Sequence, residues 1–190
     1  LWRNDKMSKK VLCILAEGFE EIEAVTPVDL LRRAGIEVVA AGLTGIDITG
    51  SHGITVLADC ELDEVDDDFD GVIIPGGIPG APNIADNAQA MGFISKMYDN
   101  GKLVAAICAS PAVVLGKAGI LSGKKVTSAP GFVEKLPSDA VFTEGRVVTD
   151  KNIITSRGAG TAAEFAGAII AYFEGKETAD KLLDATLYKR

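Results

Sequence analysis

Cys108 is the residue of this sequence whose type and neighbours most clearly suggest chemistry. It lies in Ala105-Ala-Ile-Cys108-Ala-Ser110-Pro, directly after an apolar run and before a helical pattern. A nucleophile on a sharp strand-to-helix turn needs small residues two positions before and after it, and Ala106 and Ser110 meet that need. At a helix N-terminus its thiolate would face amide N–H groups and the positive end of the helix dipole. The alternative is a structural cysteine, because free cysteine is among the most buried residue types.

A glycine pair follows another apolar run, in Pro75-Gly76-Gly77-Ile-Pro-Gly80. Paired glycines let the backbone approach a ligand closely and point N–H groups at it, as an oxyanion hole requires. We expect the amide of Gly77, with that of Ala109 and with Gly76 beside it, to bind a developing oxyanion. The segment is not a dinucleotide fingerprint, because its spacing is not G-x-G-x-x-G. A plain turn is the alternative.

Several acidic residues follow the first apolar run, in Glu17-Gly-Phe-Glu20-Glu21-Ile-Glu23. Carboxylates in the first turn of a helix commonly interact with the helix dipole, which explains Glu20 and Glu21. Glu23 could act as general acid or base on the thiol if the strand before it neighbours the strand before Cys108. We therefore expect Glu23 to be the carboxyl partner of Cys108.

Two further patterns are weaker. His52, the single histidine, is flanked by glycines in a predicted hairpin, so an exposed loop position is favoured over a catalytic base. The loop could still bring it near the site.

Asp66, Asp68 and Asp70 imitate the start of a calcium loop, but Gly77 stands where a bidentate glutamate belongs, and no calcium site is expected.

The elements that must position these residues alternate between apolar runs and helical patterns. Strands are predicted at residues 10–16, 36–41, 70–74, 102–107 and 124–127, with hairpins at 46–57 and 146–156. Helices are predicted at residues 20–33, 83–98, 109–118 and 161–172, the last opened by a Thr161–Glu164 capping box, and a short helix is predicted from residue 177. This alternation predicts a doubly wound α/β fold with a mostly parallel sheet covered by helices on both faces. In such folds, sites form at the carboxyl ends of strands where the strand order reverses.

Composition and charge restrict the function classes. The 190 residues are 47% hydrophobic and 24% charged, which is typical of one ordinary globular domain. The net charge of -8 comes entirely from residues 59–70, which hold eight acids and no base. Because the basic residues form no stripe, nucleic-acid binding is not supported. The longest apolar stretches fall far short of the roughly 20 residues of a membrane span.

The three cysteines, Cys13, Cys60 and Cys108, are odd in number and far apart. They form neither a disulfide framework nor a metal-ligand spacing, so we expect a reducing cytoplasm and no metal site. The basic N-terminus imitates a signal peptide, but Glu17 ends the apolar region below the minimum of about 7 residues. Met7 is the expected native start, which makes residues 1–6 an upstream remnant and residues 7–190 a single domain.

Four segments together resemble the ThiJ/PfpI family in order and spacing, and within it the branch of the parkinsonism-associated protein deglycase and its bacterial relatives. They are Glu17-Gly-Phe-Glu-Glu-Ile-Glu-Ala-Val-Thr-Pro-Val-Asp29, Pro75-Gly-Gly77 with Gly80-Ala-Pro-Asn83, Ala105-Ala-Ile-Cys-Ala-Ser-Pro111 and Thr155-Ser-Arg-Gly-Ala-Gly-Thr161. The resemblance covers roughly residues 9–176. It implies a flavodoxin-like fold, a homodimer and a reactive cysteine at Cys108. It also implies a carboxylic acid at Glu23 bonded to that sulfur, and an anion pocket formed by the amides of Gly77 and Ala109.

Members of this family are described as glyoxalases without cofactor, as deglycases of proteins or nucleotides, and as oxidative-stress sensors or chaperones. Older usage connects the ThiJ name with thiazole monophosphate biosynthesis. The sequence departs from the family at Ala129, where many members carry a histidine before the proline of the segment matching Val126-Thr-Ser-Ala-Pro130. A conventional Cys–His pair is therefore doubtful, and proton transfer would fall to Glu23.

The leading expectation is a cofactor-independent enzyme acting on a methylglyoxal-type 2-oxoaldehyde or its early adducts. Cys108 would add to the aldehyde and Glu23 would move a proton between two carbons before water releases a hydroxy acid. One alternative is a redox sensor in which Cys108 becomes a sulfinate, and another is a chaperone dimer with a vestigial pocket. Secondary pocket candidates are Glu20, Arg33, His52 and Ala129, and whether Arg33 and His52 approach each other stays open.

Overall fold

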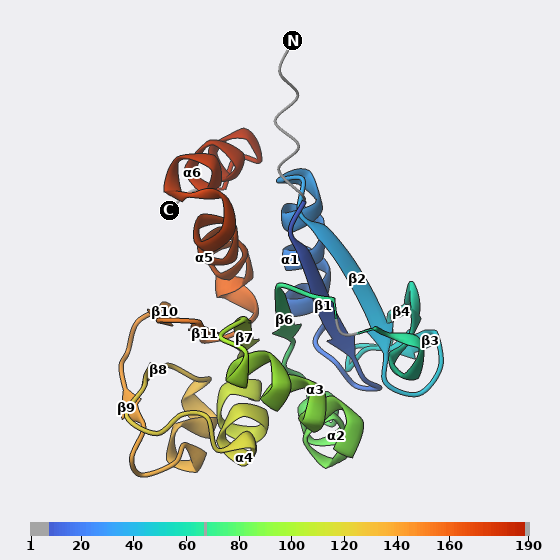
Figure 1. The fold of residues 1–190 in the computed structure, drawn as a ribbon, viewed down its shortest axis with the longest axis vertical. Coiled ribbons are helices and arrows are strands. Elements are labelled where there is room, and N and C mark those ends of the chain that lie inside the picture. The colour runs from blue at the N-terminus through green and yellow to red at the C-terminus, as the bar shows by residue number, and fades with distance from the viewer. Residues whose placement is uncertain (1–7, 67, 189–190) are drawn as a thin grey trace.

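The computed structural model describes residues 8–66 and 68–188 and, within them, centres on a seven-stranded sheet (Figure 1). The strand order is β10-β11-β7-β6-β1-β2-β5, and every neighbouring pair is parallel except β10 with β11. The strands are β1 (Lys10–Leu15), β2 (Glu37–Gly42), β5 (Cys60–Glu61), β6 (Gly71–Ile74), β7 (Leu103–Ile107), β10 (Val147–Asp150) and β11 (Ile153–Ser156). The interpretation of residues 1–6 as a remnant lies outside the described residues.

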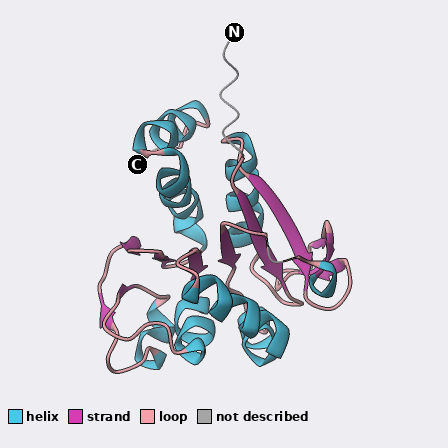
Figure 2. Cartoon of the chain, viewed as in Figure 1, coloured by secondary structure: helices cyan, strands magenta, loops and turns pink. Residues whose placement is uncertain are grey.

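Helices cover both faces of the sheet (Figures 1 and 2). One layer contains α1 (Glu21–Arg33), α5 (Ala162–Glu174) and α6 (Lys176–Ala185), and the other contains α2 (Gly80–Asp86), α3 (Ala88–Asp99), the π-helical segment η2 (Pro111–Leu115) and α4 (Gly116–Ala118). Two apolar clusters, one on each face, pack these helices onto the sheet. Because both faces are covered, β1, β6 and β7 are continuous apolar runs, buried almost throughout. The predicted doubly wound α/β fold is confirmed.

The strand order reverses between β1 and β6. After β1 the sheet grows through β2 on one side, whereas β6, β7 and β11 are added on the other side. The crevice at the carboxyl ends of the strands next to such a reversal is where open α/β sheets bind ligands. One premise is wrong, however: β6 lies between β1 and β7, so the first strand does not neighbour the strand before Cys108.

Two helical predictions need correction. The helix predicted at residues 83–98 is divided into α2 and α3, because Asn87 has an extended backbone and its side chain caps α3 by accepting from the amide of Ala90. The predicted capping box at the start of α5 is absent. Thr161 instead hydrogen-bonds to Ser156 at 2.6 Å, and Glu164 pairs with Arg146.

The remaining elements lie outside the main sheet. The hairpin predicted at residues 46–57 is present as β3 (Asp47–Thr49) and β4 (Thr55–Leu57). The strand predicted at residues 124–127 is β8 (Lys125–Val126), which pairs with the unpredicted β9 (Val141–Phe142). Three 3-10 segments are η1 (Leu62–Glu64), η3 (Pro130–Lys135) and η4 (Ala159–Thr161). Among the described residues, the helices all lack the length and apolarity needed to cross a membrane.

Candidate active site

Cys108 follows β7 in a backbone conformation that is uncommon for a residue with a side chain, with φ of 65°. Such a conformation persists only where the surroundings over-determine it. The Cys108 amide donates to the carbonyl of Ser156 at 2.9 Å. Its carbonyl accepts from the amide of Ala129 and from the hydroxyl of Ser128, each at 2.8 Å. The sharp turn therefore points the half-buried Cys108 thiol away from the end of β7, as in a nucleophile elbow.

The carboxyl group of Glu23 lies beside the Cys108 thiol, and each group shifts the pKa of the other. Glu23 is in the first turn of α1 and is only 1% exposed. Its Oε2 accepts from the amide of Gly76 at 2.9 Å. Glu20 caps the helix, because its Oε2 accepts from the amide of Glu23 at 2.8 Å. The first turn of α1 thus brings the Glu23 carboxyl group to the elbow, next to the loop that follows β6.

That loop must carry glycine at both positions of the pair. A Cβ atom on Gly76 would lie 2.6 Å from Glu23 Oε2 and 2.7 Å from the Cβ of Cys108. Gly77 has φ of 94°, and a Cβ atom there would overlap the backbone of Glu20. The close approach of three segments of chain, rather than turn formation alone, therefore explains the glycines.

The amides of the glycine pair have different partners. The amides of Gly77 and Ala109 lie on the side of the Cys108 sulfur, and both lower the pKa of its thiol. The amide of Gly76 is bound to Glu23 instead, so it is not available as a third oxyanion donor. Gly76 therefore positions the carboxyl group, whereas Gly77 and Ala109 act on the sulfur.

Burial and the charge of Glu23 raise the pKa of the Cys108 thiol to about 12, against the opposing effect of the two amides. Amide groups at the elbow are thus not sufficient to favour the thiolate while Glu23 is charged. Burial, with repulsion from Glu20, raises the pKa of Glu23 to about 7, although hydrogen bonds from Cys108 and Gly76 oppose this rise. Once Glu23 is protonated, its charge no longer opposes the thiolate and its O–H can donate to sulfur. The two groups therefore titrate as a pair that shares a proton.

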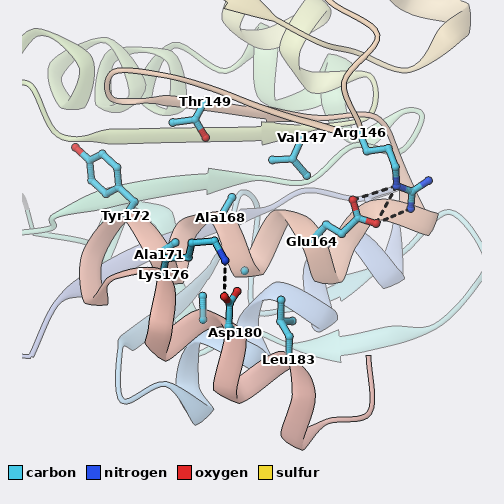
Figure 3. Close-up of a pocket in the computed structure, with 12 residues that line it drawn as sticks. Arg146, Val147, Thr149, Glu164, Ala168, Ala171, Tyr172, Lys176, Asp180 and Leu183 are labelled. Atoms are coloured by element: carbon cyan, nitrogen blue, oxygen red, sulfur yellow. Dashed lines mark hydrogen bonds and ion pairs between the residues drawn. The ribbon is translucent and has the colours of Figure 1, made fainter. Parts of the chain in front are cut away.

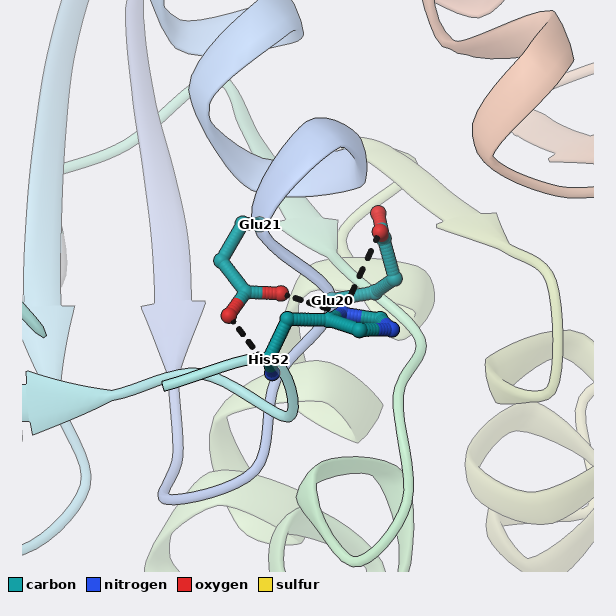
Figure 4. A group of neighbouring side chains, drawn as sticks. All are labelled: Glu20, Glu21 and His52. Atoms are coloured by element: carbon teal, nitrogen blue, oxygen red, sulfur yellow. Dashed lines mark hydrogen bonds and ion pairs between the residues drawn. The ribbon is translucent and has the colours of Figure 1, made fainter. Parts of the chain in front are cut away.

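Glu21 and His52 form an ion pair near the start of α1 (Figure 4). His52 Nδ1 lies 2.9 Å from Glu21 Oε2, and the His52 amide donates to Glu21 Oε1 at 2.7 Å. The other carboxylate beside the ring, Glu20, has an oxygen 4.0 Å from Nδ1. The three side chains are close enough to hold a metal ion, but hydrogen bonds already explain their arrangement. The sequence suggested only a dipole role for Glu21, whereas this buried carboxylate anchors the turn that carries the exposed His52.

The other two secondary candidates differ in position. Arg33 lies at the far end of α1, about 18 Å along the helix axis from Glu21, and pairs with Asp29 at 2.8 Å. The structure therefore brings Arg33 neither to His52 nor to the pocket of its own chain. Ala129 does lie at the elbow, but only its backbone amide contacts Cys108.

A separate groove of about 690 Å³ lies between β10, α5 and α6 (Figure 3). Its surface is mostly apolar, and the ion pairs Arg146–Glu164 and Lys176–Asp180 border it. None of the predicted site residues lines this groove. This groove is therefore separate from the residues gathered around Cys108.

Sequence reasoning missed two buried serines beside the nucleophile. Ser128 donates to the Cys108 carbonyl, and Ser110 donates to the carbonyl of Pro75 at 2.5 Å. Ser110 was noticed only because its small size suits the turn. The polar character of a small residue next to an apolar strand was the available signal, since a buried hydroxyl must find a partner.

A doubly wound sheet with a strained cysteine elbow one strand away from its switch point defines a class of protein, and the chain belongs to it as a member of the DJ-1/PfpI family, whose model matches residues 9–172. The chain is 40% identical over 185 residues to Protein DJ-1 homolog A of Arabidopsis thaliana, covering 96% of this chain and 47% of that protein. It is 39% identical over 151 residues to Deglycase TK1284 of Thermococcus kodakarensis, covering 78% and 89%.

The solved structure of oxidized DJ-1 from Toxoplasma gondii matches with a TM-score of 0.93 and 42% identity, covering 96% of this chain and 100% of that one. The chain spans less than half the length of the two Arabidopsis relatives, DJ-1 homologs A and B. The family resemblance expected from the four sequence segments is confirmed.

Proposed function

We propose that the protein is a cofactor-independent, cysteine-dependent enzyme that acts on methylglyoxal-type 2-oxoaldehydes or on their early adducts with proteins and nucleotides. The observation that carries this proposal is the contact between the Cys108 thiol and the Glu23 carboxyl, next to the amides of Gly77 and Ala109. A relative named as a deglycase supports the substrate class.

The reaction begins when the Cys108 sulfur adds to the aldehyde carbon and Glu23 accepts the thiol proton. The amides of Gly77 and Ala109 are the donors available to the oxyanion that forms beside the sulfur. The proton that Glu23 accepted passes on to this oxyanion, which completes a hemithioacetal and leaves Glu23 ionised again. Glu23 then removes the proton from the former aldehyde carbon and delivers it to the neighbouring carbonyl oxygen, giving an enediol. A proton added to the neighbouring carbon, and one lost from the hydroxyl of the former aldehyde carbon, convert the enediol into a thioester. The resulting thioester is hydrolysed by water, which releases a 2-hydroxy acid and the free thiol. Hydrogen is only redistributed within the substrate, so the step balances without an external oxidant.

Glu23 suits this scheme because its carboxyl group can act both as an acid and as a base. A pKa raised to about 7 by burial lets the same carboxyl both accept and donate a proton near neutral pH. The structure places no other titratable side chain against the thiol among the groups that shift its pKa. This is consistent with the alanine at position 129.

The test is lactate formation from methylglyoxal by the purified protein. Cys108→Ala is expected to reduce the rate to that of the solution without protein. Cys60→Ala, which removes another partly exposed cysteine, should keep the wild-type rate and serves as the matched control. Wild-type rates in Cys108→Ala would reject the proposal.

A redox sensor is the second candidate, and the same pocket favours it. A sulfinate on Cys108 would accept from the amides of Gly77 and Ala109, while protonated Glu23 donates to its other oxygen. Two equivalents of peroxide supply the two oxygens and leave as water. Mass spectrometry after mild peroxide should find two added oxygens at Cys108, with buried Cys13 unchanged. Equal oxidation of all three cysteines would reject this candidate.

We also infer a homodimer, because apolar side chains are exposed on α1 and the adjacent hairpin. Ile22 and Val25 are 52% and 51% exposed, and Leu57 is 70% exposed. Val25 and Leu57 border the same shallow hollow, so the apolar surface is continuous. Val25→Glu is expected to halve the mass measured by light scattering, whereas Val141→Glu, on the exposed β9, should leave it unchanged. An unchanged mass in Val25→Glu would contradict this surface.

A reducing, cytoplasmic setting is part of the same proposal. All three cysteines are free thiols, and the nucleophile has to remain reduced to react with an aldehyde. Fractionation of the source cells, followed by detection of the protein, would check this. Recovery from an oxidising compartment would contradict it.

A further inference from the structure

The hydroxyl of Ser110 joins the two halves of the candidate site. Ser110 lies two positions after the nucleophile and is fully buried. Its Oγ donates to the carbonyl of Pro75 at 2.5 Å. One buried hydrogen bond therefore connects the turn after β7 to the loop after β6, across 35 positions of sequence.

The carbonyl bound by Ser110 belongs to the same peptide group whose N–H binds Glu23. The Pro75 carbonyl and the Gly76 amide share one rigid plane, so fixing the oxygen also fixes the direction of the N–H. That N–H donates to Glu23 Oε2 at 2.9 Å. A hydrogen bond to the carbonyl also polarises the peptide and strengthens its N–H as a donor. A continuous chain of contacts thus leads from Ser110 through this peptide to Glu23 and the Cys108 thiol.

This connection matters because the loop has no side chain of its own to anchor it at the glycine pair. The carbonyl of Gly76 accepts from the Glu20 amide at 3.0 Å, and that of Gly77 accepts from the Ala81 amide at 2.9 Å. Both of those donors are backbone groups. At the Pro75 carbonyl the donor is a side chain, Ser110, and it can therefore be removed by substitution.

We propose that Ser110 is a positioning residue, whose hydroxyl acts through the Pro75–Gly76 peptide to hold the Glu23 carboxyl against the Cys108 thiol. The inference rests on the proposed function only in giving Glu23 a role in proton transfer. Removing the hydroxyl frees the peptide to rotate and weakens the Gly76 donor. Because the Gly76 hydrogen bond lowers the pKa of Glu23, its weakening should raise that pKa further.

Ser128 offers a matched control on the same turn. It is also fully buried, and its hydroxyl also donates to a backbone carbonyl, that of Cys108, at 2.8 Å. The Cys108 carbonyl keeps a second donor, the amide of Ala129, and Ser128 makes no hydrogen bond to the Pro75 loop. Ser128→Ala therefore removes one buried serine bond without disturbing the peptide that holds Glu23.

The experiment is the pH dependence of Cys108 alkylation by iodoacetamide, assigned by peptide mass spectrometry and independent of any aldehyde. Glu23→Gln identifies the inflection that belongs to Glu23, because the inflection should disappear in that variant. Ser110→Ala is expected to move this inflection to higher pH and to lower kcat for lactate formation about tenfold with little change in KM. Ser128→Ala should lower the melting temperature but keep the wild-type profile.

Ser110→Gly is the second variant, since it also lacks the hydroxyl but adds no volume to the turn, and it should move the inflection in the same direction as Ser110→Ala. A Ser110→Ala profile that coincides with those of the wild type and Ser128→Ala would overturn the inference. If Ser110→Ala does not fold, Ser110→Gly takes its place, and a Ser110→Gly profile that coincides with that of the wild type would overturn the inference. A wild-type protein that forms no lactate but shows the Ser110-dependent shift would reject the proposed function and retain this inference.

Discussion

At the scale of single residues, the proposed chemistry depends on one thiol and one carboxyl that lie side by side. Cys108 is held in a left-handed backbone conformation by bonds to both of its peptide groups, and Glu23 is buried against it. The elbow could be predicted because only small residues fit around such a turn. The function of Gly76 could not be predicted, because the direction of a peptide N–H depends on contacts such as Ser110 with Pro75.

The Glu21–His52 pair yields a prediction about stability and pH. The hydrogen bond and charge of Glu21 raise the pKa of His52, and Glu21 stays charged because hydrogen bonds outweigh its burial and lower its pKa to about 2. A raised histidine pKa contributes stability below the unfolded value of about 6.5, and this stability is lost as pH rises through the folded value. The melting temperature of the wild type should therefore exceed that of His52→Ala by more at pH 6 than at pH 8.

Arg33→Ala is the control for that comparison, because Arg33 lies at the other end of α1 and pairing with Asp29 raises the pKa of its guanidinium, which stays charged at both pH values. Its difference from the wild type should be equal at both pH values. A His52→Ala difference that is also constant would show that the pair does not contribute through charge.

At the scale of elements, the site is assembled from the ends of β1, β6 and β7. Sequence periodicity predicted each of these strands, but their order could not be deduced, since apolar runs do not specify neighbours. Glu23 reaches Cys108 although β6 separates their strands, because the glycine pair after β6 leaves space for the carboxyl. Short elements such as β9 have too few residues for a periodic signal.

Two glycine-to-alanine substitutions, one in the glycine pair and one in α3, are expected to have opposite effects. Gly76→Ala would place a Cβ atom 2.6 Å from Glu23 Oε2, so Cys108 alkylation should lose its Glu23 inflection and lactate formation should stop. Gly92→Ala lies inside α3, where a Cβ atom meets nothing within 4 Å, and should stabilise the protein by about 0.5–1 kcal/mol. A lactate assay measures the effect of Gly76→Ala on activity, and urea unfolding measures the effect of Gly92→Ala on stability. An active Gly76→Ala protein would contradict the account of this loop.

At the scale of the whole molecule, Asp59 and Asp70, the first and last acids of the acidic segment, are part of the structure and not only a solvated approach to β6. Asp59 pairs with Arg32 at 2.7 Å and also accepts from the amide of Ala40. Asp70 pairs with Lys9 at 3.1 Å and accepts from the amide of Lys10. The sequence located the charge correctly, but a count of acids could not show which of them bind the backbone of β1 and β2.

Asp70 provides the prediction at this scale. Burial opposes its charge, but the amide of Lys10 and the ammonium groups of Lys9 and Lys102 lower its pKa overall. Such a carboxylate contributes stability above its unfolded pKa, and this stability is lost as pH falls through the folded value. Asp70→Asn should therefore cost about 1–2 kcal/mol at pH 7 in urea unfolding, with the difference shrinking below about pH 4. A difference that persists at pH 2 would contradict this origin.

The most direct measurement of the central claim is the rate of lactate formation from methylglyoxal by Glu23→Gln. Glutamine keeps the shape of the side chain and can still bond to Gly76 and Cys108, but it cannot carry a proton between two carbons. The account predicts a loss of about 10²–10⁴-fold, with Cys108 still open to alkylation and the fold unchanged by circular dichroism. A Glu23→Gln enzyme that forms lactate at the wild-type rate would contradict it.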